Sequence, residues 1–177
     1  MTSDKPIVLI GFMATGKSTV GRLVAARTER AFIDLDAAIE AAAGKSVAEI
    51  FKQEGEPGFR AQESAALQMA LEKRDVVIAT GGGAACRENN LRAMLEAGFV
   101  VALQADPAEV IRRVGSGSGR PLLDGQADPQ QAAMKLLAER EPFYARAHAR
   151  IDTVGRPPEH VATDVINAFD STRSDER

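Results

Sequence analysis

Short apolar runs that alternate with helical patterns constrain the fold of this chain more than any other feature. The first run, within residues 5–10, reads Ile-Val-Leu-Ile, which is typical of a strand buried on both faces. Further strands are predicted at residues 31–35, 76–79, 99–103 and, at an edge, 150–154. Strands that alternate with helices predict a parallel sheet covered on both faces, with the strand-to-helix loops at one edge of that sheet.

The segments between these runs have helical spacing or residues that favour helix ends. Helices are predicted at residues 17–28, 36–43, 59–73, 88–97, 107–114, 129–149 and 158–169. Ser46 and Glu49 have the spacing of a capping box, which predicts another short helix that begins there. The sequence has no internal repeat and no linker long enough to divide it. A single domain is therefore expected over residues 1–170, followed by a polar tail at 171–177.

The composition excludes several classes of protein. The 177 residues carry a formal net charge of −3, whereas a nucleic-acid-binding protein is usually basic. No apolar run reaches the ~18 residues of a membrane span, and residues 1–6 lack the apolar region of a signal peptide. The single cysteine, Cys86, cannot form an internal disulfide, and neither His148 nor His160 has a partner at metal-ligand spacing. We therefore expect a cytoplasmic protein with no nucleic-acid or membrane partner.

A complete phosphate-loop pattern follows the first predicted strand and opens the first predicted helix. Residues 11–18 read Gly-Phe-Met-Ala-Thr-Gly-Lys-Ser, which matches G-x-x-x-x-G-K-S in full. The glycines let backbone N–H groups face an anion, and the helix N-terminus adds partial positive charge. Lys17 is expected to reach the β- and γ-phosphates of a nucleotide, and the Ser18 hydroxyl is expected to ligate Mg²⁺. The alternative interpretation is a glycine-rich turn before an ordinary helix.

Two aspartates follow the second predicted strand. Asp34 and Asp36 are two positions apart, and side chains two apart on an extended backbone point the same way. One carboxylate could hold Mg²⁺ through water, and the other could bind or deprotonate a hydroxyl. In the alternative, Asp34 only ends the strand and Asp36 caps the next helix. Because ligands of such sheets bind at the carboxyl ends of the strands, these aspartates, the phosphate loop and residues 81–83 are expected at one site.

Residues 115–127 break the alternating pattern. They contain Gly-Ser-Gly-Ser-Gly, followed directly by Arg120. Such a segment is too polar and glycine-rich to pack, and its length suits a mobile lid over a ligand site. A disordered surface loop is the alternative. A GTPase switch is excluded, because the chain has no Asn-Lys-x-Asp run that would read guanine.

Several motifs, taken in order along the chain, resemble the signature of the shikimate kinase family. They are Phe32-Ile-Asp-Leu-Asp36, Ile39-Glu40, Gly44, Ser46, Ile50-Phe51, Gly55-Glu56, Phe59-Arg60-x-x-Glu63, Gly81-Gly82-Gly83, Arg120-Pro121-Leu122-Leu123 and Arg140-x-x-x-Tyr144. The resemblance spans residues 7–152 and is far more specific than the phosphate loop alone. One departure is Ala14, where the family commonly has glycine, and its methyl group is expected to crowd the nucleotide slightly.

The resemblance implies a three-layer α/β fold of the P-loop nucleoside-kinase-like type. Its five-stranded parallel sheet is flanked by helices, with a mobile lid at about residues 115–127 and a substrate-binding helical segment at about 36–63. The implied activity is ATP-dependent phosphorylation of a hydroxyl of shikimate, to give shikimate 3-phosphate and ADP, with Mg²⁺ as the cofactor. A monomer is expected.

The resemblance also implies a role for each site residue. The catalytic residues would be Lys17, Asp36 and Arg120. The ATP-binding residues would be Gly11, Ala14, Thr15, Gly16, Lys17, Ser18, Thr19, Arg113, Arg120 and Pro158. The substrate-binding residues would be Asp36, Arg60, Gly81, Gly82, Gly83 and Arg140. Mg²⁺ would be held by Ser18 and, through water, by Asp34.

Two other functions remain open at this point. One is a P-loop kinase for another small hydroxy acid such as gluconate, and the other is a nucleotide-binding regulatory module that has lost phosphotransfer. A guanidinium binds a carboxylate bidentately, so Arg60 and Arg140 suit a substrate with one carboxylate. Each also has a structural alternative, because Arg60 has Glu63 three positions on and Arg140 lies between Glu139 and Glu141. The presence of every expected catalytic residue argues against a module without activity.

Overall fold

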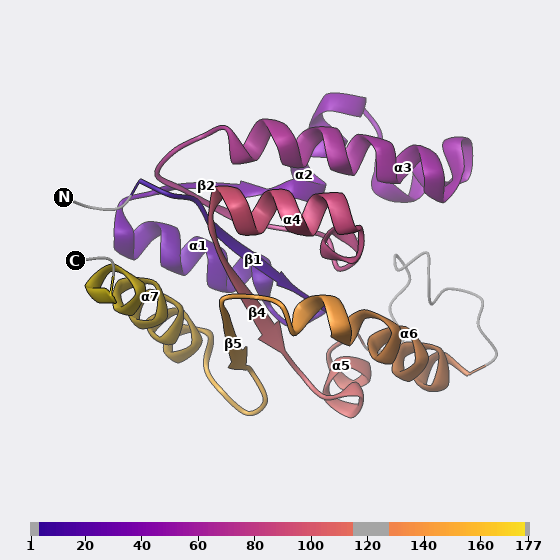
Figure 1. The fold of residues 1–177 in the computed structure, drawn as a ribbon. Helices are drawn as coiled ribbons and strands as arrows, with labels where there is room; N and C mark the ends of the chain where they lie inside the picture. Colours follow the sequence, from indigo (N-terminus) through magenta and orange to yellow (C-terminus); the bar gives the residue numbers. More distant parts are fainter. Residues whose placement is uncertain (1–3, 115–127, 176–177) are drawn as a thin grey trace.

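A five-stranded parallel sheet forms the centre of the molecule. The computed structural model describes residues 4–114 and 128–175 (Figure 1). The strands are β1 (Ile7–Gly11), β2 (Ala31–Asp34), β3 (Val76–Ala79), β4 (Phe99–Gln104) and β5 (Ala149–Asp152). Their order across the sheet is β2-β3-β1-β4-β5, and every neighbouring pair is parallel. The predicted fold class is confirmed, and the last strand lies at an edge as expected.

Helices cover both faces of this sheet and make three layers. They are α1 (Lys17–Thr28), α2 (Leu35–Ala43), α3 (Val47–Leu71), α4 (Glu88–Ala97), α5 (Pro107–Val114), α6 (Pro129–Tyr144) and α7 (Pro158–Asp175), with a short 3₁₀ helix η1 (Ala84–Cys86). Figure 1 shows α1 and α7 packed side by side on one face, and α3 and α4 lie across the other.

The central strand β1 explains how two cores form on the two faces. Val8 and Ile10 pack into the cluster that includes residues of α2, α3, α4 and α6, whereas Ile7 and Leu9 pack into the cluster with α1 and α7. All four side chains are fully buried. Because side chains alternate along a strand, an apolar run without interruption serves both faces at once.

Two predicted helix ends are wrong. The two helical segments predicted to begin at residues 46 and 59 are present as the two halves of α3, which are divided by the non-helical backbone of Gly55, and the second half begins before residue 59. The helix predicted to reach residue 149 ends at Tyr144, because Ala149 already pairs with Val101 in the sheet. Residues 171–175, predicted as part of a polar tail, continue α7, which ends at Asp175.

Three further predictions concern the lid, membrane spans and the capping box. The predicted lid at residues 115–127 lies outside the described residues. Within the described residues, no helix is both long and apolar enough to cross a membrane. The predicted capping box is confirmed, because the Ser46 hydroxyl accepts from the Glu49 N–H while the Glu49 carboxylate accepts from the Ser46 N–H.

Candidate active site

The phosphate loop lies at the carboxyl end of the central strand. β1 ends at Gly11, whose φ of 138° and close approach to the Leu103 carbonyl leave no room for a side chain. Gly16 then caps α1 with a φ of 87°. The Lys17 ammonium donates to the carbonyls of Gly11 (2.9 Å) and Phe12 (2.7 Å). These two bonds hold it at the phosphate loop, where it would be within reach of a bound phosphate. The sequence-predicted loop therefore has its expected strand–loop–helix context.

Ala14 adopts a backbone conformation that favours glycine. Its φ is 57°, in the left-handed region, where a Cβ atom crowds the following carbonyl. This gives a physical reason for the glycine that the related family commonly has at this place. The expected crowding of a nucleotide by the Ala14 methyl group is a separate effect and stays a prediction.

Asp34 is fixed beside the phosphate loop by two hydrogen bonds. Its Oδ2 accepts from the Ser18 hydroxyl at 2.5 Å, and its Oδ1 accepts from the Ala37 N–H at the start of α2. Asp34, and not Asp36, is therefore the helix cap, which reverses the alternative considered for this pair. A hydroxyl and a carboxylate oxygen side by side fit Mg²⁺, which prefers oxygen ligands and takes few from the protein. Among the described residues no group of three or more His, Cys, Asp or Glu could hold a metal alone.

Asp36 faces the space next to the phosphate loop. Its Oδ1 is buried and has no hydrogen-bond partner among the described residues. Burial raises the pKa of this carboxyl, the nearby charge of Asp34 raises it further, and Lys17 opposes the shift. A cavity of about 390 Å³ is here called the phosphate hollow. Its lining includes Lys17, Ser18, Asp34, Asp36, Thr80 and Gly81. A carboxylate with raised proton affinity and an open oxygen is suited to a ligand hydroxyl.

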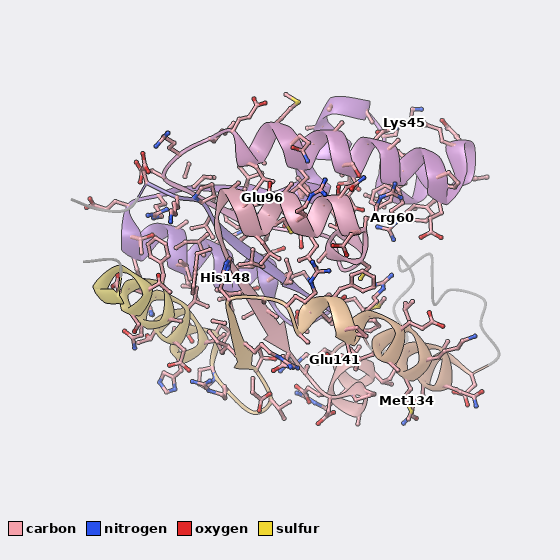
Figure 2. All side chains as sticks on the ribbon, in the orientation of Figure 1. Lys45, Arg60, Glu96, Met134, Glu141 and His148 are labelled. Atoms are coloured by element: carbon pink, nitrogen blue, oxygen red, sulfur yellow. The ribbon has the colours of Figure 1, made fainter. Side chains whose placement is uncertain are left out.

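Arg60 belongs to a buried ion pair and not to a surface one. Only 9% of the residue is exposed, and its Nη1 lies 2.8 Å from Oε2 of Glu63, which is completely buried. Its Nη2 also lies 3.2 Å from the Glu56 carboxylate. Figure 2 shows Arg60 on the side of α3 that faces α6. The surface alternative for Arg60 is therefore wrong, although the predicted pairing with Glu63 exists.

Glu63 is a functional candidate absent from the predicted site residues. Its second oxygen, Oε1, is buried without a partner in the described part of the chain. Burial raises the pKa of its carboxyl, while the charge of Arg60 lowers it. The sequence signals for this residue were its position three after Arg60 and its place in the motif Phe59-Arg60-x-x-Glu63. Its approach to the loop after β3 depends on the tertiary fold.

Arg140 lies opposite Arg60 across a second cavity. Its guanidinium carbon is 5.6 Å from the centroid of the Phe12 ring, and the residue is 7% exposed. Its neighbour Glu141 pairs with Arg150, which argues against the structural alternative for Arg140. A cavity of about 390 Å³, here called the arginine hollow, is lined by Glu56, Pro57, Arg60, Gly83, Cys86, Arg87 and Arg140. Two guanidiniums on one cavity are suited to a carboxylate.

The three glycines after β3 form the wall between these groups. A Cβ atom on Gly81 would lie 2.8 Å from Glu63 Oε1 and 3.0 Å from Asp36 Oδ1. On Gly83 it would lie 2.5 Å from the Arg60 guanidinium. On Gly82 it would lie 3.3 Å from an Arg140 nitrogen. The predicted glycines are thus brought together with the predicted acid and arginines, and their lack of side chains is what allows that approach.

A third cavity opens on the other side of the phosphate loop. This nucleotide hollow, of about 460 Å³, is lined by residues that include Ala14, Gly16, Thr19, Arg113 and Pro158. Arg113 donates to the Ala14 carbonyl, to the Thr153 hydroxyl and to the Thr153 carbonyl. It also pairs with Glu109. The predicted residues Arg113 and Pro158 therefore share one cavity, whereas Arg120 lies outside the described residues.

The fold and the site together define a class of protein. A parallel sheet carries a phosphate loop on its central strand, an acidic pair beside that loop, and a separate pair of arginines across a glycine wall. This arrangement is that of a P-loop kinase for a small anionic molecule. The cavity that would hold the phosphates lies between the nucleotide hollow, with which it shares Ala14 and Gly16, and the arginine hollow.

Comparison with known proteins identifies the family. The model of the family described as Shikimate kinase matches residues 13–170. The shikimate kinase of Caldanaerobacter subterraneus subsp. tengcongensis is 44% identical over 165 residues, which cover 93% of this chain and 96% of that protein. The shikimate kinase of Geobacter metallireducens is also 44% identical over 165 residues, covering 93% and 91%. The chain belongs to the shikimate kinase family.

Solved structures agree with that assignment. The shikimate kinase from Acinetobacter baumannii in complex with shikimate superposes with a TM-score of 0.92 at 34% identity, covering 95% of this chain and 94% of that one. A gluconokinase from Sinorhizobium meliloti gives a TM-score of 0.64 at only 15% identity, with 99% and 97% coverage. That second likeness shows a shared fold alone.

Proposed function

We propose that this chain transfers the γ-phosphoryl group of ATP to the 3-hydroxyl of shikimate, giving ADP and shikimate 3-phosphate. The observation that carries the proposal is the carboxyl of Asp36, which lines the phosphate hollow between the nucleotide hollow and the arginine hollow and whose buried Oδ1 has no hydrogen-bond partner among the described residues. A substrate whose carboxylate is bound by Arg60 and Arg140 would extend a ring hydroxyl toward this carboxyl. Family membership supports the same substrate.

Each side chain then has a defined task. Lys17 would leave its two loop carbonyls to bind the β- and γ-phosphates, where charge develops during transfer. Asp36 would accept the hydroxyl hydrogen bond and receive its proton as the new P–O bond forms. The raised pKa of Asp36 favours that transfer. Arg60 and Arg140 would hold the substrate carboxylate so that the hydroxyl stays in line with the phosphoryl group.

The cofactor in this proposal is Mg²⁺. Ser18 would ligate it directly and Asp34 would hold it through water, since their oxygen atoms already lie 2.5 Å apart. The ion would neutralise charge on the β- and γ-phosphates. Both residues line the phosphate hollow together with Lys17.

The nucleotide base would occupy the nucleotide hollow. Arg113 and Pro158 line that cavity and would flank the adenine, with Gly11, Thr15, Gly16 and Thr19 around the phosphates. Arg120 would contact the phosphates from a lid at residues 115–127. The helical segment at about residues 36–63 would bind the substrate as part of a single domain over residues 1–170.

The proposal includes a monomer and a cytoplasmic location, where ATP is available to a kinase of small metabolites.

Release of ADP in a coupled assay tests the function. We expect turnover with ATP, Mg²⁺ and shikimate, and little with gluconate in its place. Faster turnover with gluconate would favour the kinase of another hydroxy acid. Binding of ATP without turnover on either acid would favour a regulatory module.

A further inference from the structure

Tyr144 makes a contact that the proposed function does not use. It is the last residue of α6, and only 3% of it is exposed. Its hydroxyl donates to the Gly82 carbonyl at 2.5 Å, across 62 positions of sequence. Burial raises the pKa of Tyr144, so the hydroxyl keeps the proton that it donates. The side chain therefore ties the end of α6 to the middle of the glycine wall.

The Gly82 carbonyl is held by a side chain, whereas the carbonyls of the two adjacent glycines are held by backbone hydrogen bonds. The carbonyls of Gly81 and Gly83 accept from the N–H groups of Ala84 and Cys86, within the turn of η1. The Gly82 carbonyl takes no part in those backbone bonds, and the side-chain hydrogen bonds that it accepts within the described residues come from the Tyr144 hydroxyl and, at 3.9 Å, from the Cys86 thiol. Because a peptide unit is planar, holding this carbonyl also fixes the direction of the Gly83 N–H.

Gly82 and Gly83 each lie beside one of the two arginines, with no space for a side chain between them. A Cβ atom on Gly82 would meet Arg140, and a Cβ atom on Gly83 would meet Arg60. Arg140 and Tyr144 are four residues apart and thus share one face of α6. The peptide unit held by Tyr144 is therefore the piece of backbone that separates the two guanidiniums.

We propose that Tyr144 is a positioning residue whose hydroxyl, through the Gly82 carbonyl, sets the spacing between Arg140 on α6 and Arg60 on α3. This inference rests on the proposed function, in which both arginines hold the substrate carboxylate. A bidentate contact needs its donors at a fixed separation, so a loosened wall weakens substrate binding. The nucleotide hollow lies on the other side of the phosphate loop and contains neither Tyr144 nor Gly82.

The Tyr144→Phe variant tests the proposal, because it removes the hydroxyl and keeps the ring in the core. A hydrogen bond between neutral groups changes an equilibrium by about two- to ten-fold. We expect the KM for shikimate to rise by about five-fold, with kcat within about two-fold and the KM for ATP unchanged. Thr28→Val is the matched control, since it deletes a hydroxyl that donates to the Val24 carbonyl within α1, outside the site. It should leave all three constants unchanged.

Each result has one meaning. A lower thermal midpoint for Tyr144→Phe with an unchanged KM for shikimate would make the hydroxyl a purely structural contact and overturn the proposal. A rise in the KM for ATP equal to that for shikimate would overturn it as well. Absence of shikimate turnover by the unaltered protein would contradict the proposed function itself, whereas normal turnover with an unaffected variant contradicts only the role of Tyr144.

Discussion

At the scale of single residues, Asp34 and Asp36 have opposite surroundings although they are two positions apart. Both oxygens of Asp34 accept hydrogen bonds from the protein, one from Ser18 and one from the backbone of α2. Asp36 keeps a buried oxygen without a partner in the described chain. A carboxylate whose oxygens are already used is suited to a fixed role, and one with an open oxygen is suited to a ligand.

The Asp36→Asn variant should separate these roles. Asparagine keeps the shape and can hold a hydroxyl, but it cannot take the proton. We expect kcat to fall by about 10²-fold, at the lower end for a general base because phosphoryl transfer needs little early deprotonation. The KM for ATP should be nearly unchanged, since Asp34 and Ser18 remain. Steady-state kinetics with both substrates make the measurement.

The stability of the same variant serves as its control. Because burial disfavours the charged form of Asp36, removal of that charge should not lower the thermal midpoint. A near-normal kcat would reduce Asp36 to a passive contact. A large loss of ATP affinity would instead make it the residue that holds Mg²⁺.

Ala14 gives a second prediction at this scale, on stability. A left-handed conformation costs a residue with a Cβ atom about 1–2 kcal/mol, while glycine adds about 0.5–1 kcal/mol of entropy loss on folding. We therefore expect Ala14→Gly to stabilise the protein by up to about 1 kcal/mol in denaturant unfolding. Ala38→Gly, at an exposed position near the middle of α2, is the matched control and should destabilise by about 1 kcal/mol. Equal losses in both variants would contradict the strain at Ala14.

Local sequence patterns account for some site residues and not for others. The phosphate loop could be predicted because its loop and helix are adjacent in sequence. The approach of Glu63 to Gly81, and of Tyr144 to Gly82, could not be predicted, because each contact joins separate elements. The same is true of the open oxygen of Asp36, which exists only once α2 and α3 are packed.

At the scale of elements, the bend at Gly55 divides α3 into the two helical halves that the sequence predicted. Gly55 has φ 70° and ψ 180°, a conformation essentially restricted to glycine, and Pro57 follows two residues later. Glycine and proline normally end a helix, which is why two helices could be predicted here. The two halves are held together because Ile50, Phe59 and Leu67 all pack into the same core.

Replacement of Gly55 should therefore affect both stability and substrate binding. We expect Gly55→Ala to destabilise the protein by about 1–3 kcal/mol, because alanine does not tolerate these angles. Arg60 lies in the turn after the bend, so the KM for shikimate should rise while the KM for ATP changes little. Gly44→Ala is the control: Gly44 also has a positive φ, but it caps α2 with nothing near its Cβ position. That variant should lose stability without a change in the KM for shikimate. An unchanged KM in Gly55→Ala would show that the bend does not place Arg60.

At the scale of the whole molecule, one histidine makes folding stability depend on pH. Nδ1 of His148 accepts a hydrogen bond from the Val100 N–H of β4 at 3.0 Å, which requires the ring to be neutral at that atom (Figure 2). Burial lowers the pKa of His148, and the charge of Lys5 lowers it further. The folded protein thus binds the His148 proton less readily than the unfolded chain does.

The sign of the effect follows from linkage. A histidine whose pKa is lowered by folding contributes its full share of the free energy of unfolding above its unfolded pKa of about 6.5. This stabilisation is lost as the pH falls from there toward the lower pKa of the folded state. We expect the denaturation midpoint of the protein to drop between pH 7.5 and pH 5.5. The drop should be smaller in His148→Gln, whose amide oxygen can accept the same bond without titrating. His160→Gln, at an exposed position, should keep the full drop. Equal drops in all three proteins would contradict the role of His148.

The alternation of strands and helices was enough to predict a parallel sheet, but not the order of its strands. No local pattern distinguishes a central strand from its neighbours when all are apolar. Only the last strand, with a charged residue at its start, was expected at an edge. The order β2-β3-β1-β4-β5 is set by which helices can pack together on each face.

That order has a consequence for how the protein is made. β1, which precedes the other four strands of the sheet in the chain, pairs with β3 on one side and with β4 on the other, through Val77 and Phe99 opposite Ile7. During synthesis it therefore has no partner until the chain beyond residue 76 has emerged, and its second edge stays open until β4 follows. The phosphate loop that ends β1 acquires its shape at the same moment, because Gly11 fits against the backbone of Leu103. A nascent chain cannot bind nucleotide before the centre of its sheet is closed, so nucleotide binding reports on completed folding.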